Sequence, residues 1–291
     1  MSDLSKAYGV VGWPAAHSLS PAIHQYVFER MGLNHTYQRK AVPSGGLEIF
    51  LNWAARNWSG FNVTLPHKET IVSLMHGLSS TAQRIGAVNT VIRDGNQWYG
   101  ENTDAGGFVK ALLPLWQGES RAVLLGAGGA ARAVIHGLYS LHIRQVDVLD
   151  PNPEAIRRFT DHVRLFYEGL RMHVIGPGDL NAALYRSRLL VNASPVGLPP
   201  EKEKNPLPGD IRIPSGMLVM DLIPRTDETP LVKKAREGGA AAVGGLSMLI
   251  HQALLSQQAW TGRSIPDTWH QSIYHHLTRG TYVGSSDFNG R

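Results

Sequence analysis

The sequence contains no cysteine, which excludes disulfide bonds, thiolate nucleophiles and cysteine-ligated zinc. This composition suits a reducing compartment. No apolar run reaches the roughly 18 residues that a membrane helix requires, and no basic segment followed by a short apolar stretch indicates a secretory signal. We therefore expect a soluble protein of the cytoplasm with no membrane partner.

Charge is also sparse, since only 18% of the 291 residues are charged and the net charge is +5. The basic residues form no stripe with interleaved aromatics, so we do not expect nucleic acid as a partner. A modest positive charge favours small anionic ligands. The 13 histidines show no metal-binding spacing, so we expect no metal. The 43% hydrophobic content predicts a folded chain of one large domain or two ordinary ones.

Strands and helices are predicted in alternation over the first hundred residues. Ser20 is expected as an N-cap with Pro21 in the first turn, and Gly32 as the stop of that helix. A further helix over 104–116 leads out of this region. The other predicted elements are strands at 8–14, 35–42 and 60–65, a helix at 44–58, and a hairpin of 87–93 with 97–101.

A different pattern follows, because residues 121–150 read as strand, glycine loop, helix and strand. The loop "GAGGAA" begins at Gly126 and has the G-x-G-x-x-A spacing of dinucleotide-binding proteins. Gly126 permits the tight turn, Gly128 lets the backbone approach a pyrophosphate, and Ala131 lets helix and strand pack closely. The alternative is a plain glycine-rich turn. Further elements are expected at 153–169, 172–175, 179–185, 188–194, 217–223 and 247–262.

Asp150 ends the second strand of this unit. A carboxylate there accepts hydrogen bonds from the adenosine ribose hydroxyls and repels a 2′-phosphate, which favours NAD. The next residues, Pro151, Asn152 and Pro153, bring no cation, and the first arginine is Arg157. The alternative is an Asp–Pro turn with no role in cofactor choice.

Lys68 follows a strand and Pro66 in "FNVTLPHKET". Proline fits the first turn of a helix, so we expect a helix to begin there, with Lys68 at the positive end of its dipole. A cation in that position is unfavourable by roughly 0.3–1 kcal/mol, which suits a lysine that exchanges protons. Asp104 could orient it, or could merely cap the next helix. The alternative for Lys68 itself is a solvated surface lysine.

Ser18 and Ser20 place two hydroxyls on alternate positions ahead of a helix start, an arrangement that would hold a carboxylate. Together with these, the motifs "HSLSP", "NVTLPHKE", "GAVNTV", "ENTDAGGF", "GAGGAAR", "NASPVGL" and "GGLSMLIHQ" occur in the order seen in shikimate dehydrogenases. The chain resembles this family, the wider shikimate/quinate dehydrogenases, from about residue 8 to residue 262.

The resemblance implies an α/β fold with an N-terminal α/β substrate domain, a Rossmann-like dinucleotide-binding domain, and the active site in the cleft between them. Residues 1–105 would form the first domain, with the C-terminal helix of about 246–278 returning to it, and 106–245 the second. The implied reaction is reversible reduction of 3-dehydroshikimate, a small anionic hydroaromatic compound, in aromatic amino-acid biosynthesis. A monomer or homodimer is expected.

The resemblance also implies residue roles. Lys68 would be the acid–base, with Asp104 as its partner. The substrate-binding residues would be Ser18, Ser20, Thr64, Asn89, Asp104 and Gln252. The cofactor-binding residues would be Gly126, Ala127, Gly128, Gly129 and Ala130, with Gly245 and Met248 beside the nicotinamide, and Asp150 at the adenosine ribose.

Two departures from the family pattern stand out. Pro224 in "DLIP" occupies the place of a tyrosine that usually reaches the substrate, and "DPN" replaces the basic segment usual in NADP-dependent members. NADP, the usual cofactor of the family, stays an alternative to NAD. The alternatives for function are a quinate/shikimate dehydrogenase working oxidatively and a non-catalytic ligand-binding regulator.

Overall fold

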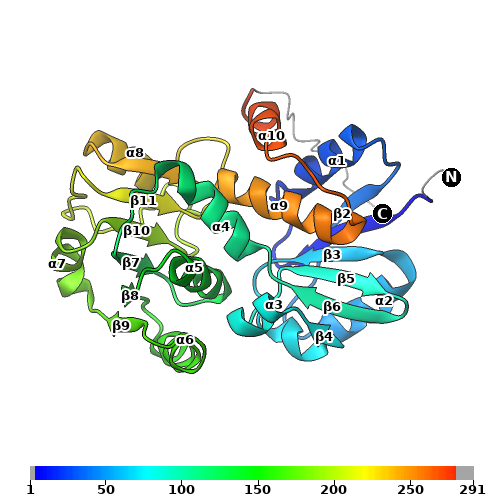
Figure 1. The fold of residues 1–291 in the computed structure, drawn as a ribbon, viewed down its shortest axis with the longest axis horizontal. Coiled ribbons are helices and arrows are strands. Elements are labelled where there is room, and N and C mark those ends of the chain that lie inside the picture. The colour runs from blue at the N-terminus through cyan, green and yellow to red at the C-terminus, as the bar shows by residue number, and fades with distance from the viewer. Residues whose placement is uncertain (1–3, 280–291) are drawn as a thin grey trace.

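The computed structural model describes residues 4–279 and contains two six-stranded sheets. One sheet is built from the first hundred residues and the other from residues 121–244, and they lie on opposite sides of a central pair of helices (Figure 1). The α/β fold expected from the sequence is therefore confirmed. No helix within the described residues combines the length and apolar character that crossing a membrane requires.

The first sheet has the strand order β2-β1-β3-β5-β6-β4 and is mixed. Strand β1 pairs in parallel with β2 and β3, whereas β3–β5 and the β5–β6 hairpin are antiparallel. A core of aromatic and aliphatic side chains, including Phe50, Trp58 and Phe61, lies between this sheet and α2. The strands are β1 Ala7–Gly12, β2 Thr36–Ala41, β3 Gly60–Val63, β4 Gly77–Leu78, β5 Thr90–Asp94 and β6 Gln97–Glu101; the helices are α1 Ser20–Arg30, α2 Leu47–Asn57 and α3 Ser80–Ile85.

The second sheet is parallel throughout, with the order β12-β11-β10-β7-β8-β9. Read from β9, this is the doubly wound 3-2-1-4-5-6 order of dinucleotide-binding folds. Its strands are apolar because both faces are covered, as the two separate core clusters show. The strands are β7 Arg121–Leu125, β8 Gln145–Leu149, β9 Arg171–Val174, β10 Leu189–Asn192, β11 Leu218–Asp221 and β12 Ala241–Gly244; the helices are α5 Gly129–Ser140, α6 Pro153–Phe166, α7 Leu180–Tyr185 and α8 Pro230–Glu237.

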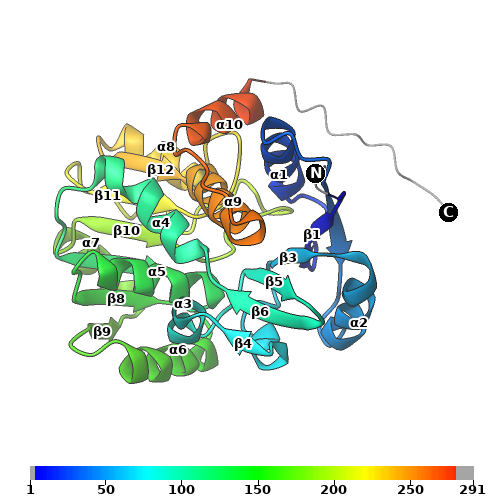
Figure 2. The same ribbon diagram turned by 45° about the vertical axis from the view of Figure 1, so that its right-hand side comes forward.

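Two helices join the halves. Helices α4 (Asp104–Leu112) and α9 (Gly245–Thr261) pack along each other between the sheets, and α10 (Trp269–Thr278) packs on α9 and α1 (Figure 2). Helix α3 of the first half lies beside α5 of the second. The division of the chain at residues 105 and 245 stays a prediction, and both positions lie outside the strands of either sheet.

The helix expected at Pro66 does not form. Residues around Pro66 and Lys68 make turns, and a short 3₁₀ helix, η1, begins only at Thr70 and runs Thr70–Leu74. The Lys68 carbonyl accepts a hydrogen bond from the Val88 backbone N–H at 2.8 Å, so a tertiary contact replaces the helical one. The expectation that a helix dipole acts on Lys68 was therefore wrong.

The expected N-cap at Ser20 was also wrong. Ser20 is the first residue of α1, and Leu19, which has no side-chain cap hydrogen bond, occupies the N-cap position. The Ser18 hydroxyl instead accepts the Ser20 backbone N–H at 3.2 Å. The stop at Gly32 is confirmed, because its φ of +68° is left-handed and its N–H reaches back to Glu29.

Candidate active site

A cavity of about 240 Å³ lies between the two halves of the molecule. Its walls come from the carboxyl ends of β1 and β3, the start of α1, the start of α4 and the middle of α9. Leu198, Pro199 and Pro224 contribute from the second half. The cavity brings together Ser18, Ser20, Thr64, Lys68, Asn89, Asp104 and Gln252, which are all of the substrate-binding and catalytic residues expected from the sequence.

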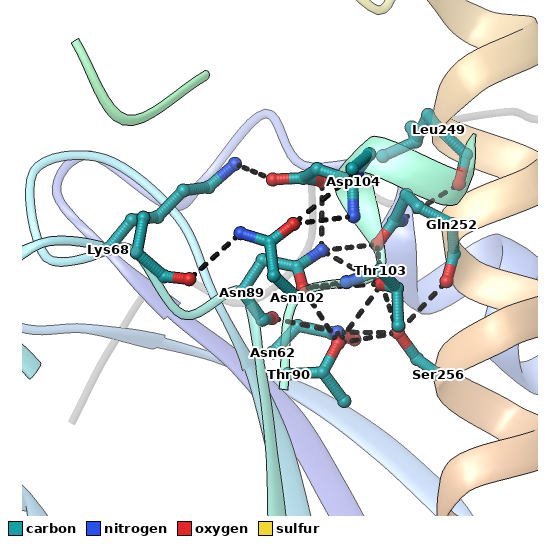
Figure 3. A network of polar contacts seen from close by, with 12 residues as sticks. Asn62, Lys68, Asn89, Thr90, Asn102, Thr103, Asp104, Leu249, Gln252 and Ser256 are labelled. Atoms are coloured by element: carbon teal, nitrogen blue, oxygen red, sulfur yellow. Dashed lines mark hydrogen bonds and ion pairs between the residues drawn. The ribbon is translucent and has the colours of Figure 1, made fainter. Parts of the chain in front are cut away.

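Lys68 and Asp104 form a close ion pair in this cavity, with 2.6 Å between Nζ and Oδ2 (Figure 3). Their side chains are only 16% and 7% exposed, so water screens the pair weakly. Asp104 is the first residue of α4, where the helix dipole favours a carboxylate. The Asn102 side chain accepts the Asp104 backbone N–H at 3.1 Å. Asn102 thus satisfies a free backbone N–H at the start of α4, and the Asp104 carboxylate is available to bind Lys68.

Asn89 holds the other oxygen of Asp104. Its Nδ2 donates to Asp104 Oδ1 at 2.8 Å and to Gln252 Oε1 at 3.1 Å. Its Oδ1 accepts the Thr103 backbone N–H at 2.7 Å. The Gln252 Nε2 donates to the Leu249 carbonyl at 2.8 Å, so this amide is fixed from both ends. The cavity therefore presents an ammonium, a carboxylate and two amides in a defined orientation.

The serine end of the cavity is built differently. Ser20 is buried at the start of α1, whereas Ser18 is half-buried in the loop before it. Arg39 of β2 donates to the Ser18 carbonyl through Nε at 3.1 Å and Nη2 at 2.7 Å, which fixes that loop. Gly12 leaves room for Thr64, because a Cβ there would lie 2.3 Å from Thr64 Cγ2.

Sequence reasoning missed several residues of this site. Trp13, His17 and Asn62 line the cavity but had no expected role, although His17 and Asn62 are the first residues of the motifs "HSLSP" and "NVTLPHKE". Asn62 carried a weak signal, because it is a polar residue in a short strand whose other members are apolar or small. Arg39 lay in a strand of polar residues that gave no reason to choose it over its neighbours.

The glycine loop fits a dinucleotide phosphate. Gly126 has φ of +102°, and a Cβ there would lie 2.8–2.9 Å from the backbone of Ala193 and Ser194, so only glycine is tolerated. A Cβ on Gly128 would meet nothing within 4 Å, so the space that a side chain would fill is open beside the loop. Helix α5 starts at Gly129 without a side-chain cap, which leaves its first N–H groups for an anion.

Asp150 closes this loop from the second strand. Its Oδ2 accepts the Ala127 N–H at 2.9 Å, and its Oδ1 accepts the Asn152 N–H at 2.8 Å. The second contact is the Asp–Pro turn considered as an alternative above. Each oxygen retains a lone pair, so the turn does not prevent the carboxylate from accepting a further hydrogen bond.

Gly245 and Met248 lie at the start of α9. A Cβ on Gly245 would lie 2.3 Å from the Leu222 carbonyl oxygen, so glycine is needed for α9 to approach the segment after β11. Met248 is 7% exposed and packs in the core of the second half. Asp221 anchors the same segment by accepting hydrogen bonds from Asn192, Ile223 and Thr229, and its burial raises the pKa of its carboxyl group.

Comparison with known proteins agrees with this geometry. The profile of the shikimate dehydrogenase substrate binding domain matches residues 10–91. A shikimate dehydrogenase (NADP(+)) from a Nostoc species is 35% identical over 284 residues, covering 94% of this chain and 97% of the relative. This chain belongs to the shikimate dehydrogenase family.

Solved structures of the family share the fold. A shikimate 5-dehydrogenase from Thermus thermophilus, in complex with NADP(H) and shikimate, is 32% identical with a TM-score of 0.81, covering 94% of this chain and 99% of that one. The enzyme from Listeria monocytogenes, in complex with shikimate and NAD, is 25% identical with a TM-score of 0.80, covering 94% and 97%. The recognition made from the ordered motifs is thus confirmed, as is the Rossmann-like second half.

Proposed function

We propose that this chain catalyses the reversible nicotinamide-dependent reduction of 3-dehydroshikimate to shikimate. The observation that carries the proposal is the Lys68–Asp104 ion pair. It faces the cavity between the two halves of the molecule, which polar side chains of the first half line. Family membership supplies the substrate class, because the relatives carry the name shikimate dehydrogenase.

The substrate would be held at both ends of the cavity. Ser18 and Ser20, beside the N-terminus of α1, would donate hydrogen bonds to the substrate carboxylate. At the opposite end the ring hydroxyls would meet Thr64, Asn89, Asp104 and Gln252. Because the amides of Asn89 and Gln252 are already oriented by protein contacts, little side-chain entropy is lost on binding.

The dinucleotide, when bound at Gly126–Ala130 with its nicotinamide toward Gly245 and Met248, supplies the hydride. As the carbonyl carbon gains the hydride, Lys68 Nζ donates a proton to the carbonyl oxygen, so the ketone becomes an alcohol. Asp104 accepts a hydrogen bond from Lys68 and keeps the ammonium aimed into the cavity. In the oxidative direction Lys68 takes the hydroxyl proton back.

For the cofactor we favour NAD over NADP. Asp150 would stand next to the 2′-phosphate of NADP, and two like charges in a partly desolvated site cost on the order of several kcal/mol. Pro151 and Asn152 offer no compensating cation, and Arg158 is paired with Glu154 at 2.8 Å. The relatives include proteins named for NADP(+) and a structure holding NAD, so both cofactors occur around this fold.

Kinetics with each cofactor test this choice. We expect kcat/KM for NAD to exceed that for NADP, and Asp150→Ala to narrow the gap by weakening NAD and admitting NADP. Asp161→Ala is the control, because it removes an exposed carboxylate from the same region without touching the loop. A clear NADP preference in the wild type contradicts the proposal.

The reaction itself is tested by following nicotinamide reduction with shikimate and with quinate. We expect turnover with shikimate. Turnover with quinate alone would indicate a quinate dehydrogenase, an alternative left open because Pro224 lines the cavity where the family usually has a tyrosine. Tight binding of shikimate without turnover would indicate the regulator instead.

A further inference from the structure

Three hydroxyl groups form a closed triangle behind the Lys68–Asp104 pair. They belong to Thr90 of β5, Thr103 just before α4 and Ser256 of α9 (Figure 3). The hydroxyl oxygen of Thr90 lies 3.2 Å from that of Thr103 and 2.8 Å from that of Ser256, and the Thr103 and Ser256 oxygens are 3.1 Å apart. Thr90 and Ser256 are fully buried, and neither lines the cavity. The triangle therefore joins three separate elements without touching the space where a substrate would bind.

The triangle is connected on both sides. Asn62 Nδ2 donates to Thr90 Oγ1 and to Ser256 Oγ, at 3.0 Å in each case. Ser256 in turn donates to the Gln252 carbonyl at 3.0 Å, one turn back along α9. On the other side, the hydroxyls of Thr90 and Thr103 reach Asn89 Oδ1 at 3.1 and 3.2 Å.

These contacts decide which way the Asn89 amide points. Its Oδ1 accepts the Thr103 backbone N–H and the Thr90 hydroxyl, and its Nδ2 faces the Thr103 hydroxyl at 2.9 Å as well as Asp104 Oδ1 and Gln252 Oε1. A rotated amide would set one acceptor oxygen against another and leave buried donors unpaired, which is unfavourable. With Oδ1 of Asp104 held by Asn89, the Oδ2 atom is the one that meets Lys68.

We propose that Thr90 and Ser256 are positioning residues, which act through Asn89 on the Asp104–Lys68 pair. The proposal rests on the proposed function, since it assigns these residues to the proton transfer by Lys68. Ser256 also fixes α9 against β5. Gln252 on that helix and Asn89, just before β5, therefore keep their relative positions.

The test uses two substitutions at Thr90. Thr90→Val keeps the shape of the side chain and removes the hydroxyl, whereas Thr90→Ser keeps the hydroxyl and removes a methyl group. We expect Thr90→Val to lower kcat about tenfold, the size of one buried hydrogen bond, while KM for shikimate changes less. Thr90→Ser should retain kcat to within about twofold. Thr160→Val, on α6, controls for the substitution itself.

A second readout does not need turnover. The side-chain amide signal of Asn89 in a ¹H–¹⁵N spectrum, assigned by its loss in Asn89→Ala, should shift or broaden in Thr90→Val and in Ser256→Ala but not in Thr90→Ser. If the wild type turns over no shikimate, the proposed function fails and this spectrum alone decides the positioning role.

Two outcomes overturn the proposal. One is an unmoved Asn89 signal in Thr90→Val, whatever happens to kcat, because Thr90 would then act on stability or packing only. The other is a kcat in Thr90→Val within about twofold of an active wild type, since the loss of one buried hydrogen bond would then not reach the reacting groups.

Discussion

Arg132 of α5 forms an ion pair with Glu69, the residue that follows Lys68, with 3.2 Å between Nη2 and Oε2. The two side chains differ in exposure, since Arg132 is 10% exposed and Glu69 is 38% exposed. The Arg132 Nε has no hydrogen-bond partner within the described part of the chain. The pair ties the turn that carries Lys68 to the helix that follows the glycine loop, and a Cβ on Gly129 would lie only 3.3 Å from Lys68 Cβ.

This asymmetry predicts unequal costs for removing the two partners. Glu69→Ala leaves a buried guanidinium without its counter-ion and should lower the free energy of unfolding by about 1–3 kcal/mol. Arg132→Met leaves only a carboxylate that water reaches, and should cost less although Arg132 is the more buried residue. Urea unfolding of both variants and of the double variant checks this. A larger cost for Arg132→Met would contradict the explanation.

Lys68→Ala should lower kcat by roughly 10²–10⁴-fold, the usual size of a general acid–base contribution, and change KM for shikimate much less. Lys110→Ala is the matched control, because Lys110 pairs with Asp267 at 2.7 Å away from the cavity. If the Lys68 variant keeps more than a third of wild-type kcat, Lys68 is not the proton donor.

Ser18→Ala combined with Ser20→Ala should mainly raise KM for shikimate, because both hydroxyls would contribute equally to ground-state and transition-state binding. Since Leu19 and not Ser20 is the N-cap of α1, Ser20→Ala alone should not show the roughly 1 kcal/mol loss of a helix cap. The measurements are steady-state kinetics and thermal unfolding, with Ser73→Ala on η1 as a control. An unchanged KM in the folded double variant would remove the carboxylate site from this end of the cavity.

The ordered motifs predicted the second sheet and the membership of the cavity well. Both depend on local signals. The glycine loop needs its glycines for steric reasons. Lys68 and Asp104 each follow a strand of the first sheet, and their side chains meet in the cavity. The motifs failed where a contact distant in sequence decides the backbone. The Val88 backbone N–H donates a hydrogen bond to the Lys68 carbonyl, and no sequence pattern near Pro66 predicts this contact.

The hydroxyl triangle could not be predicted from the sequence for a similar reason. Thr90 is an ordinary strand residue in sequence, and Ser256 is one small residue in an apolar helix. Only the packing of α9 on the hairpin brings them to within 2.8 Å. Ser20 shows the reverse error, because α1 begins one residue earlier than expected, with Leu19 at the N-cap position and Ser20 as the first helical residue.

Acid should destabilise the protein through His24. This residue is fully buried, its ring stacks on Tyr37 at 4.2 Å, and burial lowers its pKa to about 3. The unfolded chain binds a proton at His24 below about pH 6.5, whereas the folded chain does not until about pH 3. Unfolding therefore takes up a proton in this window, and the free energy of unfolding falls as the pH falls.

Between pH 6.5 and pH 5 this one group should cost about 2 kcal/mol. His24→Phe, which keeps a ring against Tyr37, should reduce the loss of stability between pH 7 and pH 5 by that amount. Urea unfolding of both proteins at the two pH values gives the difference. An equal loss in the variant would show that other groups carry the acid sensitivity.

Pro224→Tyr concerns the departure from the family pattern at the cavity. Pro224 lines the pocket, in a segment that Asp221 anchors through three hydrogen bonds. Proline cannot donate a hydrogen bond from its side chain, whereas a tyrosine hydroxyl can donate one to a carboxylate or a ring hydroxyl. We expect KM for shikimate to fall or to stay level in Pro224→Tyr. Pro224→Phe adds the same ring without the hydroxyl, so a fall in KM with tyrosine alone would identify the hydrogen bond as the cause. A large rise in KM with both variants would mean that the segment around position 224 is shaped differently from the family pattern, so that the correspondence implied by the resemblance fails at this position.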